Sequence, residues 1–238
     1  MLKENIYIHL PRFHGRRKGH ALSKRRQKLI ADVLPRCSLV FDRNDCLNAT
    51  ASFGREGSLW LEIGFGAGEH LIDQALKNPN INFIGCEPYI NGVATLLSEI
   101  ERHSINNICI FNDDVRILLK KLRRSSIDKI FLLFNDPWPK KRHNSRRLIS
   151  PEVLDELSKI MANGSKILVS SDDLNLIRSM LNLFYCHHNF FWSANSPDDW
   201  KKRYSGSIAT RYENKAISGG KDCIYLSFTH KNKKTLSF

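Results

Sequence analysis

The run from Leu59 to Gly68 (LWLEIGFGAG) constrains the fold of this chain more than any other segment. Its first half is a short apolar run typical of a buried strand, and its second half carries glycine at every other position. Residues 69–77 follow with apolar side chains at helical spacing. Because glycine lets the backbone turn tightly and approach a ligand closely, this order predicts an α/β unit that binds a ligand at the turn.

The alternation of strand and helix patterns continues to the end of the chain. Ser150 and Pro151 predict a helix start, and Gly164 is expected to end that helix. Residues 193–221 are rich in Ser, Asn, Pro and Gly and are predicted to form a long loop. The pattern predicts a doubly wound α/β domain with a mostly parallel sheet. The expected strands are 58–63, 81–86, 108–111, 127–134, 166–170, 186–192 and 223–230, and the expected helices are 69–77, 91–102, 115–123, the one from Pro151 that Gly164 ends, and 173–184.

Residues 1–50 are predicted to be a basic N-terminal extension of a single domain formed by residues 51–238. Residues 1–28 hold nine Lys or Arg and one acid and are interpreted as a mobile arm, with a short helix possible over 22–34. The net charge of +13 indicates a polyanionic partner, either nucleic acid or an anionic membrane. A general lysine bias explains the charge less well, because it is concentrated in the arm and in residues 140–147.

The six cysteines have neither metal-ligand spacing nor the pattern of a secreted disulfide framework. Cys86 and Cys109 fall in apolar runs and are expected to be buried. No apolar run approaches the roughly 18 residues that span a bilayer, and the Pro and Gly near the N-terminus fit an organelle presequence poorly. We therefore expect a cytoplasmic protein without membrane segment or metal, present as a monomer or a homodimer.

The spacing of Gly64, Gly66 and Gly68 distinguishes between cofactors. A dinucleotide site has G-x-G-x-x-G, whereas this run is E-x-G-x-G-x-G with Glu62 before the first glycine. An acid at that position suits a cationic ligand better than a phosphate. We therefore expect S-adenosylmethionine, whose amino-acid end carries an ammonium beside a sulfonium, with Glu62 holding it directly or through water.

Acids also end the next two predicted strands. Glu87 can accept hydrogen bonds from both hydroxyls of a ribose, although NAD would use the same acid. Asp113 and Asp114 stand where an acid can accept from an adenine amino group. Taken singly, each acid is more often a helix cap than a ligand. Acids at three successive strand ends beside this glycine turn favour a nucleoside cofactor.

The fourth predicted strand ends in Asn135-Asp136-Pro137-Trp138-Pro139, and five basic residues follow within 140–147. A loop of polar and aromatic residues at this end of a buried strand is well placed to face the transferred methyl group. The alternative is a structural turn in which Trp138 packs on the core.

This loop and its basic tail resemble the bacterial tRNA (guanine-N(7)-)-methyltransferases. The resemblance covers most of the chain and implies a Rossmann-like class I S-adenosylmethionine-dependent methyltransferase fold with an antiparallel C-terminal strand. The chain departs from the family pattern at Asn135, where many members have proline, and at Pro139, where many have histidine. Neither departure removes a charged group. The other matching segments are GRRKG at 15–19, Leu34-Pro35, LEIGFGAGEHL, Glu87, Asp114-Val115, Ser171-Asp172 and TRYE at 210–213.

The resemblance implies methyl transfer from S-adenosylmethionine to N7 of a guanine in the variable loop of tRNA, which gives N7-methylguanosine. It implies that Asp136 is the catalytic residue. It further implies cofactor contacts from Glu62, Glu87, Asp114 and Asp136, and substrate contacts from Lys140, Asp172, Thr210, Arg211, Tyr212 and Glu213.

Guanine N7 presents a lone pair and carries no proton at neutral pH, so the reaction needs no general base. The sequence indicates no histidine–acid pair poised for that role. Catalysis would depend on aligning N7, methyl and sulfur, with Asp136 stabilising the positive charge that moves onto the base. Asp172 or Glu213 is expected to accept from the guanine N1–H and amino group, which leaves N7 free.

Binding to RNA follows from the same interpretation. The target base must leave its stack to enter a pocket. The Arg and Lys side chains of residues 12–28 and 140–147 are expected to contact phosphates.

Three other functions fit parts of the sequence. An adenine amino-group methyltransferase would carry [DN]-P-P-[FYW] after the fourth strand, but Trp138 replaces the second proline. The glycine spacing disfavours an NAD-dependent oxidoreductase. A non-catalytic RNA-binding protein would have no need to keep all of these acids.

Overall fold

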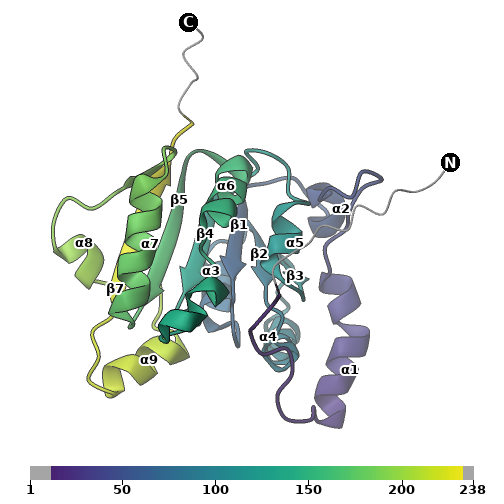
Figure 1. The fold of residues 1–238 in the computed structure, drawn as a ribbon. Helices are drawn as coiled ribbons and strands as arrows, with labels where there is room; N and C mark the ends of the chain where they lie inside the picture. Colours follow the sequence, from purple (N-terminus) through teal and green to yellow (C-terminus); the bar gives the residue numbers. More distant parts are fainter. Residues whose placement is uncertain (1–11, 233–238) are drawn as a thin grey trace, which may run out of the picture.

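The computed structural model describes residues 12–232 of the chain. Seven strands form one sheet: β1 (Leu59–Ile63), β2 (Asn82–Cys86), β3 (Ile108–Phe111), β4 (Ile127–Leu133), β5 (Met161–Ser171), β6 (Phe190–Trp192) and β7 (Ile224–His230). Their order across the sheet is β3-β2-β1-β4-β5-β7-β6 (Figure 1). Strands β1 to β5 are parallel, and β7 is antiparallel to both of its neighbours. The predicted mostly parallel sheet with an antiparallel C-terminal strand is confirmed.

Helices cover both faces of the sheet. They are α1 (Lys24–Asp32), α2 (Ala49–Phe53), α3 (Glu69–Lys77), α4 (Ile90–His103), α5 (Val115–Leu119), α6 (Pro151–Ile160), α7 (Leu174–Cys186), α8 (Asp198–Lys201) and α9 (Arg211–Ser218), with 3₁₀ turns η1 (Leu34–Cys37) and η2 (Lys141–Arg146). Successive strand residues point to opposite faces. Phe83 therefore packs with α1, α3 and α4, whereas Ile84 packs with α5, α6 and α7.

Side-chain caps account for several helix starts. Ser150 accepts a hydrogen bond from the amide of Val153, and Pro151 occupies the first position of α6, as predicted. Asp173 caps α7 in the same way through the amide of Leu176. These caps satisfy amide groups that have no partner within the helix.

Three sequence-based predictions are wrong. Residues 193–221 contain α8 and α9 and are not a long loop. Gly164 does not end α6, because that helix stops at Ile160 and the chain enters β5 directly at Met161, with Gly164 inside the strand at φ +82°. The helix predicted over 115–123 ends at Leu119.

The predicted short helix near the N-terminus is confirmed as α1, whose Leu29 is buried, together with the following Val33, against the α4 side of the sheet. From residue 12 the preceding segment is held by α4, because Arg17 O accepts from the amide of Ile90 and the amide of Gly19 donates to Asn91 Oδ1. Residues 1–11 of the predicted mobile arm lie outside the described residues. The division of the chain at residue 50 stays a prediction.

Within residues 12–232, no helix is both long and apolar enough to cross a membrane. All six cysteines are free thiols, and Cys86 and Cys109 are buried in strands as predicted. The same part of the chain contains no cluster of three or more His, Cys, Asp or Glu side chains suited to a metal ion.

Candidate functional site

The glycine turn after β1 has a left-handed backbone at each of its three glycines. The φ angles of Gly64, Gly66 and Gly68 are +74°, +59° and +87°. Residues with a Cβ rarely adopt such angles. The spacing recognised in the sequence therefore reflects a backbone path that requires glycine at every second position.

The start of α4 packs closely against this turn. A Cβ added at Gly92 would lie 2.0 Å from the carbonyl oxygen of Gly66. A side chain at position 92 would therefore push the turn and the helix apart. Sequence reasoning missed Gly92, although a glycine near the start of a predicted helix is a signal of close backbone approach.

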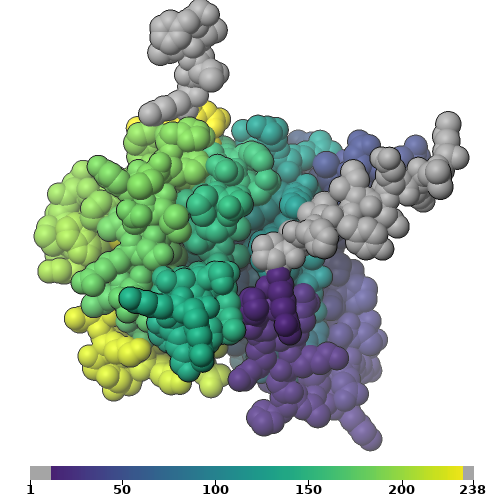
Figure 2. Space-filling model, viewed as in Figure 1, coloured from purple at the N-terminus to yellow at the C-terminus, as the bar shows by residue number. Residues whose placement is uncertain are grey.

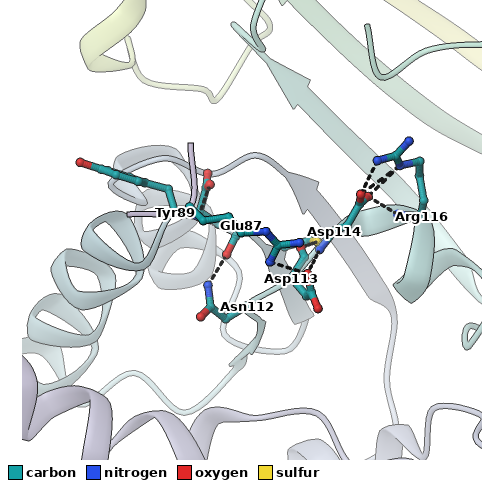
Figure 3. A network of polar contacts seen from close by, with 8 residues as sticks. Glu87, Tyr89, Asn112, Asp113, Asp114 and Arg116 are labelled. Atoms are coloured by element: carbon teal, nitrogen blue, oxygen red, sulfur yellow. Dashed lines mark hydrogen bonds and ion pairs between the residues drawn. The ribbon is translucent and has the colours of Figure 1, made fainter. Parts of the chain in front are cut away.

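Glu87 directly follows β2 (Figure 3) and is buried. Its Oε2 accepts from the amide of Gly66 at 2.8 Å, and its Oε1 accepts from the amide of Tyr89 at 2.9 Å. Burial raises the pKa of Glu87 above its usual 4.5. The negative charges of Asp136 and Glu62 also raise the pKa of Glu87, whereas the two backbone hydrogen bonds lower it.

Asp113 and Asp114 follow β3 and have different surroundings (Figure 3). The Asp113 side chain is 40% exposed and pairs with Arg17 Nη1 at 2.8 Å. Asp114 is buried, caps α5, and receives two hydrogen bonds from the Arg116 guanidinium at 3.0 Å and one at 2.5 Å. Asp113 is therefore the more accessible acid, and Asp114 has the helix-cap role considered from the sequence.

Glu62 at the end of β1 forms a buried pair with a histidine that sequence reasoning missed. His70 Nδ1 lies 2.6 Å from Glu62 Oε2, and the two side chains are 1% and 4% exposed. The pair is buried, so it does not contradict the expectation that no histidine–acid pair is poised as a general base. The only signal in the sequence was the position of His70 in the first turn of the helix after the glycines, where the apolar pattern hid it.

The loop after β4 is strained at both ends. Phe134 and Trp138 have φ angles of +52° and +46°, which are uncommon for residues other than glycine. Asn135 Oδ1 is buried without a hydrogen-bond partner in the described part of the chain. Asp136 between them is exposed. The fold therefore holds an unusual backbone to present one carboxylate at this edge.

Trp138 is surrounded by cations and histidines. His14 and His143 contact its ring edge-on at 6.3 and 5.9 Å, and the Arg146 guanidinium lies 5.1 Å from the ring centre. Desolvation and the charge of Arg146 lower the pKa of both histidines. The N-terminal segment thus meets the loop after β4, which Figure 2 shows as the dark purple segment beside the teal surface.

The predicted substrate residues divide into exposed and buried groups. Lys140 and Arg211 are exposed, and Tyr212 is 60% exposed with its ring near Gly66. Asp172 pairs with Lys221 at 2.5 Å.

Thr210 and Glu213 instead have structural contacts. Thr210 caps α9 by accepting from the amide of Glu213. Glu213 is 1% exposed, and its Oε1 accepts from Arg203 Nε at 2.7 Å and from the Tyr225 hydroxyl at 2.5 Å. Thr210 and Glu213 also line a small cavity with His70, Ser170, Ser207 and Tyr225. The structure therefore brings the end of β5, α9 and the glycine turn to one edge of the sheet.

Comparison with known proteins gives a consistent result. A family model described as "Putative methyltransferase" matches residues 56–226. The chain is 40% identical over 224 residues to a protein of Rhodospirillum rubrum named "tRNA (guanine-N(7)-)-methyltransferase", a match that spans 92% of this chain and 88% of that protein. Proteins of the same name from Roseobacter denitrificans and Bartonella henselae are 41% and 40% identical over 226 residues, spanning 92% of this chain and 96% and 95% of theirs.

Solved structures share the fold at low identity. An antibiotic-related methyltransferase superposes with a TM-score of 0.54 at 13% identity, over 83% of this chain and 98% of that one. A 16S rRNA methyltransferase, KamB, gives a TM-score of 0.51 at 16% identity, over 81% and 99%. These likenesses show the class I methyltransferase fold alone.

Proposed function

The chain belongs to the tRNA (guanine-N(7)-)-methyltransferase family, and we propose that it transfers the methyl group of S-adenosylmethionine to N7 of a guanine in the variable loop of tRNA. Besides the similarity to these relatives, the placement of three acidic residues in the structure supports this proposal. Glu62 and Glu87 stand at the carboxyl ends of the adjacent parallel strands β1 and β2, and the strained loop that presents Asp136 follows β4, the other neighbour of β1.

The residues at this edge fit S-adenosylmethionine chemically. The ammonium, ribose hydroxyls and adenine amino group of that cofactor are hydrogen-bond donors, and the edge offers carboxylate acceptors at Glu62, Glu87 and Asp113. A Cβ placed at Gly64 would meet no atom of residues 12–232 within 4 Å, so the backbone there faces open space. A ligand can approach the turn closely on that side.

The cofactor contacts follow from these positions. We assign the ribose hydroxyls to Glu87, whose oxygens are already oriented by two backbone amides. His70 contacts Oε2 of Glu62, so we assign the ammonium to Oε1. The adenine side belongs to Asp113 and Asp114 at the end of β3. The bound cofactor supplies an electrophilic methyl group on a sulfonium.

On the acceptor side, we assign the charge-stabilising role to Asp136. Methylation makes the guanine ring cationic, and an exposed carboxylate beside the ring favours that charge. Alignment of the base supplies most of the remaining acceleration. Asp172 is the better candidate for reading the guanine edge, because Glu213 is buried against Arg203 and Tyr225 and instead holds α9 in place.

The tRNA contacts are assigned to the basic segments on both sides of Trp138. Lys140, Arg211 and Tyr212 are exposed at the same edge. Phosphate contacts from Lys and Arg position RNA without reading its sequence. As part of this proposal, the enzyme works in the cytoplasm, where its six free cysteines stay reduced.

A labelling assay tests the proposal. The purified protein is incubated with S-adenosylmethionine labelled in the methyl group and with tRNA that lacks modifications, and the labelled nucleoside is identified after digestion. We expect N7-methylguanosine, and a tRNA whose variable-loop guanine is replaced by adenine should take up no label. Labelled N6-methyladenosine, or no label in the first tRNA, would contradict the proposal.

A further inference from the structure

One face of α3 holds the chain segment that precedes α9. His70, Gln74 and Lys77 lie at positions i, i+4 and i+7 of this helix and share a face. Gln74 Nε2 and Lys77 Nζ donate to the carbonyl oxygen of Gly206 at 3.0 and 3.1 Å, and His70 Nε2 lies 3.1 Å from Ser207 Oγ. The helix that starts at the glycine turn is therefore tied to a segment 130 residues later in the chain.

His70 also connects this segment to the cofactor side. Its Nδ1 faces Glu62 Oε2, and a carboxylate can only accept, so Nδ1 carries the proton. Its Nε2 lies 3.1 Å from the Ser207 hydroxyl, which can both donate and accept a hydrogen bond. The result is a continuous hydrogen-bonded chain from Glu62 through His70 to Ser207.

The buried position of His70 makes this arrangement specific. The ring is 1% exposed and packs against Phe131 with the centres 4.6 Å apart. Leu71 and Ala75 of the same helix fill the neighbouring core, whereas an apolar side chain at position 70 would leave the buried Glu62 carboxylate without this hydrogen-bond partner. A buried histidine that forms hydrogen bonds with two different chain segments holds both segments in place.

We propose that His70 is a positioning residue that couples cofactor binding to the binding of tRNA. It orients Glu62 toward the cofactor ammonium and, through Ser207, fixes residues 202–210, which lead into α9. This inference rests on the proposed function. Contact of the cofactor with Glu62 favours the hydrogen-bonded chain from Glu62 through His70 to Ser207. Binding of the cofactor therefore strengthens binding of tRNA, and binding of tRNA strengthens binding of the cofactor. His70 has no acid–base role, because N7 carries no proton to remove.

The test measures this coupling by titration calorimetry, with S-adenosylhomocysteine as the probe. The Kd for tRNA is determined with and without saturating S-adenosylhomocysteine, and the ratio is the coupling factor. We expect wild-type protein to bind tRNA roughly fivefold or more tightly with the probe, as is common for coupled sites. Ser207→Ala should reduce the ratio to about 1 and leave the Kd for S-adenosylhomocysteine alone nearly unchanged.

Two further variants separate positioning from general damage. Ser205→Ala removes an exposed serine two residues away and should keep the wild-type coupling. His70→Asn can keep a donor toward Glu62 but cannot reach Ser207, so it should bind S-adenosylhomocysteine better than His70→Ala while lacking coupling. If either His70 variant is unfolded by circular dichroism, the comparison of Ser207→Ala with Ser205→Ala decides alone.

The inference is overturned if wild-type protein shows no coupling, or if Ser207→Ala retains it. Its failure is distinct from failure of the proposed function. If only the inference fails, wild-type protein still forms N7-methylguanosine in tRNA. If the proposed function fails, wild-type protein forms no N7-methylguanosine.

Discussion

Asp136 is exposed in a loop whose neighbours Phe134 and Trp138 have left-handed backbones. Asp136→Asn keeps the size of the side chain and removes its charge. We expect kcat for N7 methylation to fall roughly 10²-fold, because a preorganised charge near the reacting group is worth about that much. The Tm should not change, since the side chain is not part of the core. Initial rates at saturating tRNA and S-adenosylmethionine measure the effect, and full turnover of the variant would refute the assigned role.

Glu87 should make cofactor binding depend on pH. Burial raises its pKa above 4.5, and its ionised form is the stronger hydrogen-bond acceptor at both oxygens. The affinity for S-adenosylhomocysteine should therefore fall as the pH is lowered through this raised pKa. Calorimetry between about pH 4.5 and 8 measures the step. Glu87→Gln should bind weakly at every pH, and a step of unchanged size in that variant would assign it to another group.

The raised pKa of Glu87 also makes the free energy of unfolding depend on pH. The folded pKa of Glu87 lies above the unfolded one, so the folded protein binds more protons between the two values. The contribution of Glu87 to the free energy of unfolding is then complete below pH 4.5 and is lost as the pH rises through the folded pKa. The ligand-free protein thus keeps this buried acid at a stability cost near neutral pH.

At the scale of elements, Ser104 offers a clean test of backbone strain. It ends α4 with φ +52° and ψ +40° and is exposed. A left-handed residue with a Cβ is strained by about 1–2 kcal/mol, whereas glycine loses more chain entropy on folding. Ser104→Gly should therefore raise the free energy of unfolding by about 0.5–1 kcal/mol in urea titrations.

Gly54 provides the matched control for that variant. It ends α2 with φ +68°, and a Cβ there would meet no atom within 4 Å in the described structure. Gly54→Ala should lower the free energy of unfolding by about 1 kcal/mol through backbone strain alone. If Gly54→Ala stabilised the protein, or Ser104→Gly destabilised it, the backbone at these helix ends in solution would not have the left-handed conformation described above.

Short sequence patterns predicted those strands and helices that are stabilised by residues close together in the sequence. The strands are apolar runs, and α6 and α7 begin at side-chain caps that stand next to them in the sequence. Helix α9 was missed because it buries only Glu213 and Ala216, and Glu213 is satisfied by Arg203 and Tyr225 from other segments. Contacts of that kind leave no periodic signal in the sequence.

The candidate site was predictable for a similar reason. The acids at 62, 87, 113 and 114 stand at strand ends, and parallel strands bring those ends to one edge of the sheet. His70 escaped notice because residues 69–77 were interpreted through their apolar side chains, yet one of these, Leu76, is 49% exposed while His70 is buried. Its partner Ser207 lies 137 residues away, and only the tertiary fold brings the two together.

At the scale of the whole molecule, basic residues lie at both ends of the parallel strands. The segment from residue 12 follows the start of α4 and reaches Trp138 through His14, so the two basic segments recognised in the sequence are neighbours in space (Figure 2). Lys120 and Arg124 lie instead near the start of β4, at the opposite edge of the sheet. The distribution of charge, more than its total, should therefore control tRNA binding.

The salt dependence of tRNA affinity tests that distribution. Each phosphate contact contributes about 0.7–0.9 to the slope of log K against log salt concentration. Removing two exposed cations in Arg25→Ala/Lys28→Ala, or in Lys141→Ala/Arg142→Ala, should reduce the slope by roughly 1.5. Lys120→Ala/Arg124→Ala removes the same charge from the opposite edge and should leave the slope unchanged. Equal losses in all three variants would mean that the total charge of +13 attracts tRNA without a defined surface.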